Sequence, residues 1–247
     1  KCASCLAGKS NICADRQIIS MPPRAGAFAD MVAIPLENLL VVPRQDLLKP
    51  AALTEPLACG WHAARLGLRR QNGPVSGLTC VVLGGGAIGV GAALCLSAMG
   101  VHDITLIEVN PLRLETLHGI AGFEATDGND ASAPVPSSAD LVIDGVGFAS
   151  TRTSACELAK PGGVICHIGL GSGEGGVDVR RLTLQEITFI GTYTYTPQDF
   201  RDTGAAIFAG QLGPLDWVET RPLSEGQAAF EDIRNGRTPA PKIILIP

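Results

Sequence analysis

The stretch Cys80–Gly100, CVVLGGGAIGVGAALCLSAMG, places three consecutive glycines between an apolar, β-branched run and a run of Ala, Leu, Ile and Val. Glycine weakens both strands and helices, because its backbone loses more freedom on ordering than that of other residues. Glycines in this place therefore indicate that the bare backbone itself is needed. We expect a strand over Thr79–Leu83, a tight turn, and a helix over Ile88–Ala98.

The turn matches the pattern G-x-G-x-x-G, directly after a strand and at the start of a helix. The first glycine allows the sharp turn, the second lets a pyrophosphate approach the backbone, and the third lets the helix pack close to the sheet. Free N–H groups and the helix dipole then favour phosphate. This pattern predicts that a dinucleotide binds at Gly84, Gly86, Ala87, Ile88 and Gly89.

An acidic residue ends the next expected strand, Ile104–Glu108, 19 residues after Gly89. A carboxylate in this place accepts hydrogen bonds from the adenosine ribose and repels a 2′-phosphate. Val109 and Asn110 follow Glu108, so no arginine stands directly after it, and the pattern favours NAD over NADP. The alternative interpretation is a tight turn without a ligand, with Glu108 as a solvated strand end.

Arg113 lies five residues after Glu108, on an expected helix over Pro111–Ile120. Two roles are open for this side chain. It could lie over the adenine and bind the cofactor, or it could form an ion pair with Glu108 or Glu115 on the helix surface.

Strand and helix patterns alternate along the rest of the chain. Further strands are expected at Asp103–Glu108, Asp140–Asp144, Gly163–Gly169 and Glu186–Thr192, and further helices at Ser150–Leu158 and Pro197–Gln211. This alternation predicts an α/β fold with a doubly wound parallel sheet of the Rossmann type. Outside it, short strands are expected within residues 26–42 and at Lys242–Ile246.

The composition is that of a globular chain with a large core, since 46% of the 247 residues are hydrophobic and 17% are charged. The net charge of -5 and the absence of a basic cluster argue against nucleic acid or an anionic membrane as the main partner. No apolar run reads as a membrane span, and no signal peptide is visible. The scattered cysteines in apolar segments suit a reducing compartment, so we expect a cytoplasmic protein.

Three of the eight cysteines, Cys2, Cys5 and Cys13, follow the spacing C-x2-C-x7-C. Close thiolates on a loop suit a tetrahedral zinc ion. Three thiolates leave one position open, and this loop offers no His or carboxylate for a catalytic site. A structural site would need a fourth cysteine, which would have to precede Lys1. Free loop thiols are the alternative.

These residues resemble the zinc-dependent medium-chain alcohol and polyol dehydrogenases, in the branch of sorbitol, L-idonate and galactitol dehydrogenases. The resemblance covers essentially the whole chain. It rests on the cysteine loop and on GAFADMVAIPLENLLVVP (26–43), TEPLACGWHAARLG (54–67), VVLGGGAIG (81–89), LVIDGVG (141–147) and KPGGVICHIGL (160–170). On the family spacing C-x2-C-x2-C-x7-C, the three cysteines are the second, third and fourth ligands of a structural zinc. The chain is therefore expected to be truncated at its N-terminus.

The resemblance also implies a domain plan. Residues 1–57 would be the remnant of a β-rich, GroES-like catalytic domain that carries the structural-zinc lobe. Residues 58–196 would form the dinucleotide-binding domain, and residues 197–247 would return to the catalytic domain.

Several site residues follow from the resemblance. Glu55 matches the acidic position at the catalytic metal, so it is expected as a catalytic and metal-site residue, with Cys59 as the alternative ligand. The backbone of Ile168, Gly169 and Leu170 is expected to touch the nicotinamide. The stretch GTYTYT (191–196) is placed at the cofactor–substrate cleft; its plain interpretation is an exposed hinge.

The implied activity is oxidation of a secondary alcohol, on a polyol or sugar acid, by hydride transfer to NAD with zinc as Lewis acid. The chain alone is expected to bind cofactor without full activity. One alternative is a zinc-free quinone or enoyl reductase of the same superfamily, and another is a non-catalytic NAD-binding module. A homodimer or homotetramer is expected, with the edge strand Glu186–Thr192 pairing across a two-fold axis.

Overall fold

The computed structural model describes residues 1–247, and its centre is a parallel β-sheet. The strands are β1 (Thr79–Leu83), β2 (Asp103–Ile107), β3 (Glu124–Thr126), β4 (Ala139–Asp144), β5 (Ala159–His167) and β6 (Thr188–Gly191). Their order across the six-stranded sheet is β3-β2-β1-β4-β5-β6, and all pairs are parallel. The chain changes direction across the sheet between β1 and β4, so a ligand-binding crevice is expected at the carboxyl ends of these two strands.

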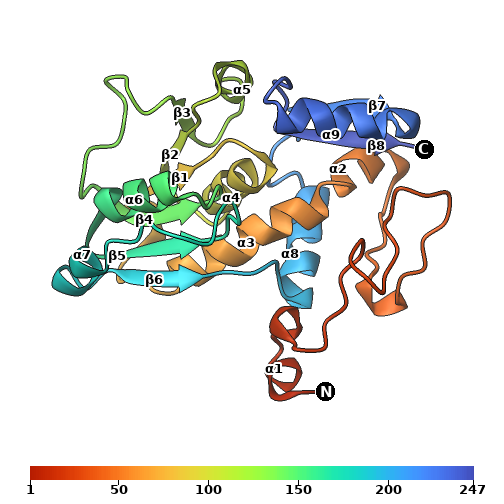
Figure 1. The fold of residues 1–247 in the computed structure, drawn as a ribbon, viewed down its shortest axis with the longest axis horizontal. Helices are drawn as coiled ribbons and strands as arrows, with labels where there is room; N and C mark the ends of the chain where they lie inside the picture. Colours follow the sequence, from red (N-terminus) through yellow and green to blue (C-terminus); the bar gives the residue numbers. More distant parts are fainter.

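Helices cover both faces of the sheet (Figure 1). One face carries α3 (Thr54–Leu68), α4 (Ala87–Ala98), α5 (Pro111–Leu117) and α8 (Pro197–Phe208). The other face carries α6 (Ala149–Leu158) and α7 (Val179–Leu184). The predicted doubly wound parallel sheet is therefore confirmed, with helices on both sides of strands that are apolar along their length.

The two ends of the chain lie beside this unit. The C-terminal part is a second, two-stranded parallel sheet of β7 (Val218–Pro222) and β8 (Lys242–Ile246), joined by α9 (Gly226–Arg234). The N-terminal part contains two short helices, α1 (Ala3–Leu6) and α2 (Leu48–Ala51), and a long irregular segment (Figure 1). Short 3-10 turns occur at Ser10–Ile12, Leu36–Asn38, Gln45–Leu47, Val75–Gly77 and Leu223–Glu225.

The expectation of short strands within residues 26–42 was wrong. This segment is irregular apart from the 3-10 turn Leu36–Asn38, and the backbone hydrogen bonds there are turn bonds, such as Leu39 N–H to Leu36 O at 3.1 Å. A strand needs a neighbouring strand to pair its N–H and C=O groups, and none lies beside this segment. Leu40 instead packs on α8, where a Cβ added at Gly204 would lie 2.0 Å from its Cδ2 atom.

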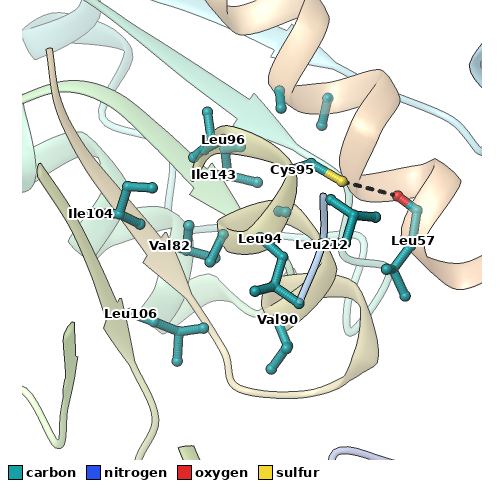
Figure 2. Packing of buried hydrophobic residues seen from close by; sticks show 14 of the residues in the cluster. Leu57, Val82, Val90, Leu94, Cys95, Leu96, Ile104, Leu106, Ile143 and Leu212 are labelled. Carbon is teal, nitrogen blue, oxygen red and sulfur yellow. Dashed lines mark hydrogen bonds between the residues drawn. The ribbon is translucent and has the colours of Figure 1, made fainter. Parts of the chain in front are cut away.

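The main hydrophobic core lies between the sheet and the face that carries α3 and α4, and it contains 27 buried residues. Strand residues and helix residues interdigitate there, as Figure 2 shows for Val82, Ile104 and Ile143 against Val90 and Leu94. A second cluster of 10 buried residues lies under α6. No helix combines the length and the apolarity that crossing a bilayer requires.

Glycines let α3 and α4 approach each other closely. A Cβ at Gly60 would lie 2.4 Å from the backbone N of Ala92, and one at Gly91 would lie 3.2 Å from the Cα of Leu57. At the same crossing the Cys95 thiol contacts the Leu57 carbonyl oxygen at 3.6 Å (Figure 2). Because α4 begins at the glycine turn, this crossing holds the turn against α3.

The Gly60→Ala variant tests this crossing. Alanine is the better helix former, yet here its methyl group would strike backbone atoms, so the two helices must separate. We expect the free energy of unfolding, measured by urea denaturation, to fall by about 1–3 kcal/mol. Gly77→Ala is the matched control, because a Cβ there meets nothing within 4 Å. Equal stability of the two variants would contradict the proposed close contact.

Candidate functional site

Of the three glycines in the G-x-G-x-x-G pattern after β1, two are required by the fold and one faces open space. Gly84 has φ +96°, and a Cβ at Gly89 would lie 1.8 Å from the Gly84 carbonyl oxygen. A Cβ at Gly86 would meet nothing within 4 Å, although Gly86 is the N-cap residue of α4. The fold itself therefore explains Gly84 and Gly89, whereas the open side of Gly86, next to Ala87 and Ile88, leaves room for a ligand at the helix start.

Glu108 follows β2 and lies against this turn. Its side chain is buried, with 5% of its surface exposed. Its Oε2 atom accepts hydrogen bonds from Gly85 N (2.9 Å) and Arg113 Nη1 (3.0 Å), and Oε1 accepts from Asn110 N (2.8 Å). The alternative of a solvated Glu108 is therefore wrong. For Arg113, the structure shows the ion pair with Glu108.

Two further turns lie at the carboxyl ends of β4 and β5. Asp144 is fully buried, and its Oδ1 atom accepts hydrogen bonds from Val146 N (3.0 Å) and Gly147 N (2.9 Å). A Cβ at Gly147 would lie 2.2 Å from the backbone of Gly169. The predicted segment Ile168–Leu170 thus lies directly against the turn after β4, where the side chain of Leu170 is 85% exposed.

Arg152 on α6 organises the loop beyond that segment, and sequence reasoning missed it. Its side chain is buried, and its guanidinium donates to the carbonyl oxygens of Gly147 (2.8 Å), Ser172 (2.9 Å) and Gly175 (2.6 Å). The only signal was one arginine in the helical stretch ASTRTSACEL. The loop borders a cavity of about 530 Å³ that Arg152, His167, Gly169, Leu170 and Phe189 help to line.

The start of α3 brings Glu55, Cys59 and Tyr195 together. Glu55 is exposed in the first turn of the helix, and Cys59 lies one turn later with 7% of its surface exposed. Burial raises the pKa of the Cys59 thiol to about 12, and the Glu55 carboxylate adds to this shift. Burial also raises the pKa of Tyr195, and the Glu55 carboxylate adds to this shift. Tyr195 therefore lies near the start of α3.

The three N-terminal cysteines form a compact cluster. The Sγ atom of Cys2 lies 3.7 Å from that of Cys5 and 3.8 Å from that of Cys13, and all three sulfur atoms lie within 4.8 Å of one another. No disulfide joins them. A tetrahedral ion with Zn–S bonds of about 2.3 Å separates its sulfur ligands by about 3.8 Å. The donor set and its spacing therefore fit three corners of a zinc-thiolate tetrahedron.

A buried ionic network ties α3 to α8. Asp199, 1% exposed, accepts hydrogen bonds from Arg65 Nε (2.5 Å) and Thr196 N (3.0 Å), and His62 Nδ1 lies 2.8 Å from its Oδ2 atom. Burial by itself would raise the pKa of Asp199, but the hydrogen bonds from His62, Arg65 and Thr196 outweigh it and hold the pKa well below its usual range. His62 is thus a packed helix histidine with a charged partner.

Comparison with known proteins agrees with this geometry. Residues 87–209 match the family described as zinc-binding dehydrogenase. This chain carries a zinc-binding dehydrogenase domain. It is 28% identical over 206 residues to a sorbitol dehydrogenase of Arabidopsis thaliana and 27% identical over 206 residues to an L-idonate 5-dehydrogenase of Vitis vinifera. Both alignments cover 79% of this chain and 55% of the relative, so the chain spans about half the length of these relatives.

Two solved enzyme structures share the fold of this chain. An acetophenone reductase from Geotrichum candidum, solved in complex with NAD, superposes with a TM-score of 0.84 at 22% identity, over 97% of this chain and 68% of the other. L-Idonate 5-dehydrogenase from Escherichia coli superposes with a TM-score of 0.80 at 22% identity, over 100% of this chain and 72% of the other. The zinc-binding dehydrogenase domain therefore has the architecture of these enzymes.

The Asp199→Asn variant tests the network between α3 and α8. A carboxylate with a lowered pKa in the folded state adds stability above its unfolded pKa of about 3.9, and this stability is lost as the pH falls below that value. Removing the charge leaves Arg65 and its partners without their counter-ion. We expect urea denaturation at pH 7 to show a loss of about 3–5 kcal/mol.

The same variant should be less sensitive to acid than the unchanged chain, with a smaller difference in stability between pH 7 and pH 3. Asp202→Asn, one turn along α8 and hydrogen-bonded only to Gln198, is the control. A loss at pH 7 no greater than that of the control would show that the network contributes little.

Proposed function

We propose that this chain is the coenzyme-binding part of an NAD- and zinc-dependent dehydrogenase that oxidises a secondary alcohol of a polyol or sugar acid. The observation that carries this proposal is the open face of Gly86 at the start of α4, next to the buried carboxylate of Glu108. A dinucleotide needs both features, because its diphosphate requires free N–H groups and its adenosine ribose requires an acceptor. The names of the relatives support a polyol or sugar-acid substrate.

The residues that would hold NAD line the carboxyl edge of the sheet. The diphosphate would lie along the turn Gly84–Gly89, where the helix start supplies N–H donors. Glu108 would accept from the ribose, and Arg113, which lies beside it, would border the adenine. The segment Ile168–Leu170 would hold the nicotinamide. Its position against the turn after β4, with an exposed Leu170 side chain, supports a flat apolar contact with the ring.

Two sets of residues would hold zinc. The thiolates of Cys2, Cys5 and Cys13 fit a structural ion by their donor type and spacing. For the catalytic ion we propose Glu55 over Cys59, because Glu55 is exposed while the thiol of Cys59 is buried and has a raised pKa. When bound, such a zinc ion stabilises an alkoxide, and NAD accepts the hydride.

The task of this chain in the reaction is to position the reactants. The backbone contact between Gly147 and Gly169 fixes the edge against which the nicotinamide would lie, and so aligns one reactant. Tyr195, packed beside Glu55, would keep water from that carboxylate on one side. The cysteine cluster argues against a zinc-free reductase and against a purely NAD-binding module, because neither needs three converging thiols.

The remaining expectations are part of the same proposal. Residues 1–57 and 197–247 would belong to a GroES-like catalytic unit, and residues 58–196 to the coenzyme domain. The chain alone would bind NAD without full activity. A cytoplasmic homodimer or homotetramer would form through β6, which is the edge strand of the large sheet and offers unpaired backbone groups.

The Gly86→Val variant tests coenzyme binding. Its side chain would point into open space, so the fold should tolerate it, but the space is that of the diphosphate. We expect isothermal titration calorimetry to show NAD binding by the unchanged chain and at least a hundredfold weaker binding by Gly86→Val, which corresponds to about 2.7 kcal/mol. Gly77→Val, also in open space, should bind as the unchanged chain does. If all three bind NAD equally, the proposed site is wrong.

The Glu108→Gln variant tests the choice of coenzyme. The amide still accepts from Gly85 N, but it no longer repels a 2′-phosphate and no longer holds Arg113 in an ion pair. We expect NAD affinity to fall and NADP affinity to rise, so that the ratio of the two dissociation constants changes by about tenfold or more. Glu115→Gln, on α5 with Arg113, is the control. A parallel loss of both affinities would mean that Glu108 only supports the turn.

A further inference from the structure

The cysteine loop is joined to the segment that follows β6. Asn11, which lies between Cys5 and Cys13, donates from Nδ2 to the Tyr193 carbonyl oxygen at 2.8 Å. Arg16 lies over the ring of the same tyrosine, with its guanidinium carbon 4.8 Å from the ring centroid. The loop and the segment are about 180 residues apart in the chain, as the separation of 182 between Asn11 and Tyr193 shows.

Arg16 also holds the loop at its last cysteine. Its Nη1 atom donates to the Cys13 carbonyl oxygen at 3.0 Å, and its backbone N–H donates to the same oxygen at 3.2 Å. One side chain therefore contacts both the backbone of a proposed zinc ligand and the ring of Tyr193. The backbone at Cys13 and the ring of Tyr193 are therefore connected through this one guanidinium.

The other end of the segment is fixed independently. Asp199 binds both the backbone N–H and the hydroxyl of Thr196, and Arg65 anchors Asp199 to α3. Between the two anchors Thr194 has φ +45°, a left-handed conformation that a β-branched residue seldom adopts. Such a conformation persists only where the surroundings impose it. Tyr195 comes next, beside Glu55, and its ring stacks on Phe200 at 5.5 Å.

We propose that Asn11 and Arg16 are positioning residues that transmit metal binding at Cys2, Cys5 and Cys13 to Tyr193 and, through the turn at Thr194, to Tyr195. Metal binding orders the loop, Asn11 and Arg16 hold Tyr193, and the anchor at Thr196 turns that restraint into a fixed position for Tyr195 beside Glu55. The cysteine cluster thus sets the geometry near the proposed catalytic centre, besides stabilising its own lobe. This inference rests on the proposed zinc site.

The chain is suited to a direct test because it contains two tyrosines, Tyr193 and Tyr195. Full-length chain labelled with 3-fluorotyrosine should give two fluorine resonances, which Tyr193→Phe and Tyr195→Phe assign. Zn²⁺ is added to the metal-free chain, bound zinc is counted by elemental analysis, and the resonances are followed. We expect both resonances to shift as one Zn²⁺ per chain binds.

The variants Asn11→Ala and Arg16→Ala separate the effect of zinc on Tyr195 from zinc binding itself. Both keep the three cysteines, so each should still bind one Zn²⁺ per chain, but the zinc-dependent shift of the Tyr195 resonance should be lost. Arg24→Ala is the matched control, because Arg24 is an exposed arginine of the same N-terminal region that pairs only with Gln17, and it should shift as the unchanged chain does. NAD binding is measured in parallel, so that a failure of the coenzyme site is seen separately.

Four outcomes would overturn the inference. Zinc could bind without moving either tyrosine resonance, or the resonances could shift equally in the two variants and the unchanged chain. In these two cases the proposed dehydrogenase function is unaffected, but Asn11 and Arg16 do not transmit zinc binding to the tyrosines. If Asn11→Ala and Arg16→Ala no longer bind zinc, the two residues only shape the lobe. Failure of the unchanged chain to bind zinc would overturn both the zinc proposal and this inference.

Discussion

The contact of backbone with backbone at the carboxyl edge of the sheet is the constraint on which the rest of the structure depends. Gly89 touches the Gly84 carbonyl, Gly145 touches the Leu83 carbonyl, and Gly147 touches Gly169, each at a distance that excludes a side chain or forces its neighbours to move. These contacts bring the turns after β1, β4 and β5 into one row. A long, extended ligand can then lie across three strands without meeting a side chain at every step.

Two buried charged side chains hold these turns in place. Glu108 ties the glycine turn to α5 through the Gly85 amide and Arg113, and Arg152 ties the loop after β5 to α6. Both charged groups are buried, and both are hydrogen-bonded to backbone groups or to an opposite charge. Buried charges without such partners would be costly, so these side chains fix the relative positions of turns that have few apolar contacts of their own.

The cysteine loop is joined to this unit by polar and aromatic contacts with the segment that follows β6. Asn11 and Arg16 meet Tyr193, while many apolar side chains between the lobe and α2 stay exposed, among them Met31, Leu36 and Val41. The lobe is therefore placed by the end of β6, and the end of β6 is placed in turn by α3 through Asp199. The cysteines are thus connected to the start of α3, which carries Glu55, through the segment that follows β6.

The sequence by itself determined the doubly wound α/β architecture and the glycine turn at the start of α4. Apolar runs such as Thr79–Leu83 can be buried only between two helical layers, and the glycine spacing leaves one backbone conformation open. It missed β3, α7, β7 and α9, because short or largely polar elements such as Val218–Pro222 form only against a partner. For the same reason it wrongly placed strands within residues 26–42. Only the tertiary structure decided which polar groups of distant segments meet. Arg65 and Asp199, or Asn11 and Tyr193, are brought together by folding and leave no pattern in the chain.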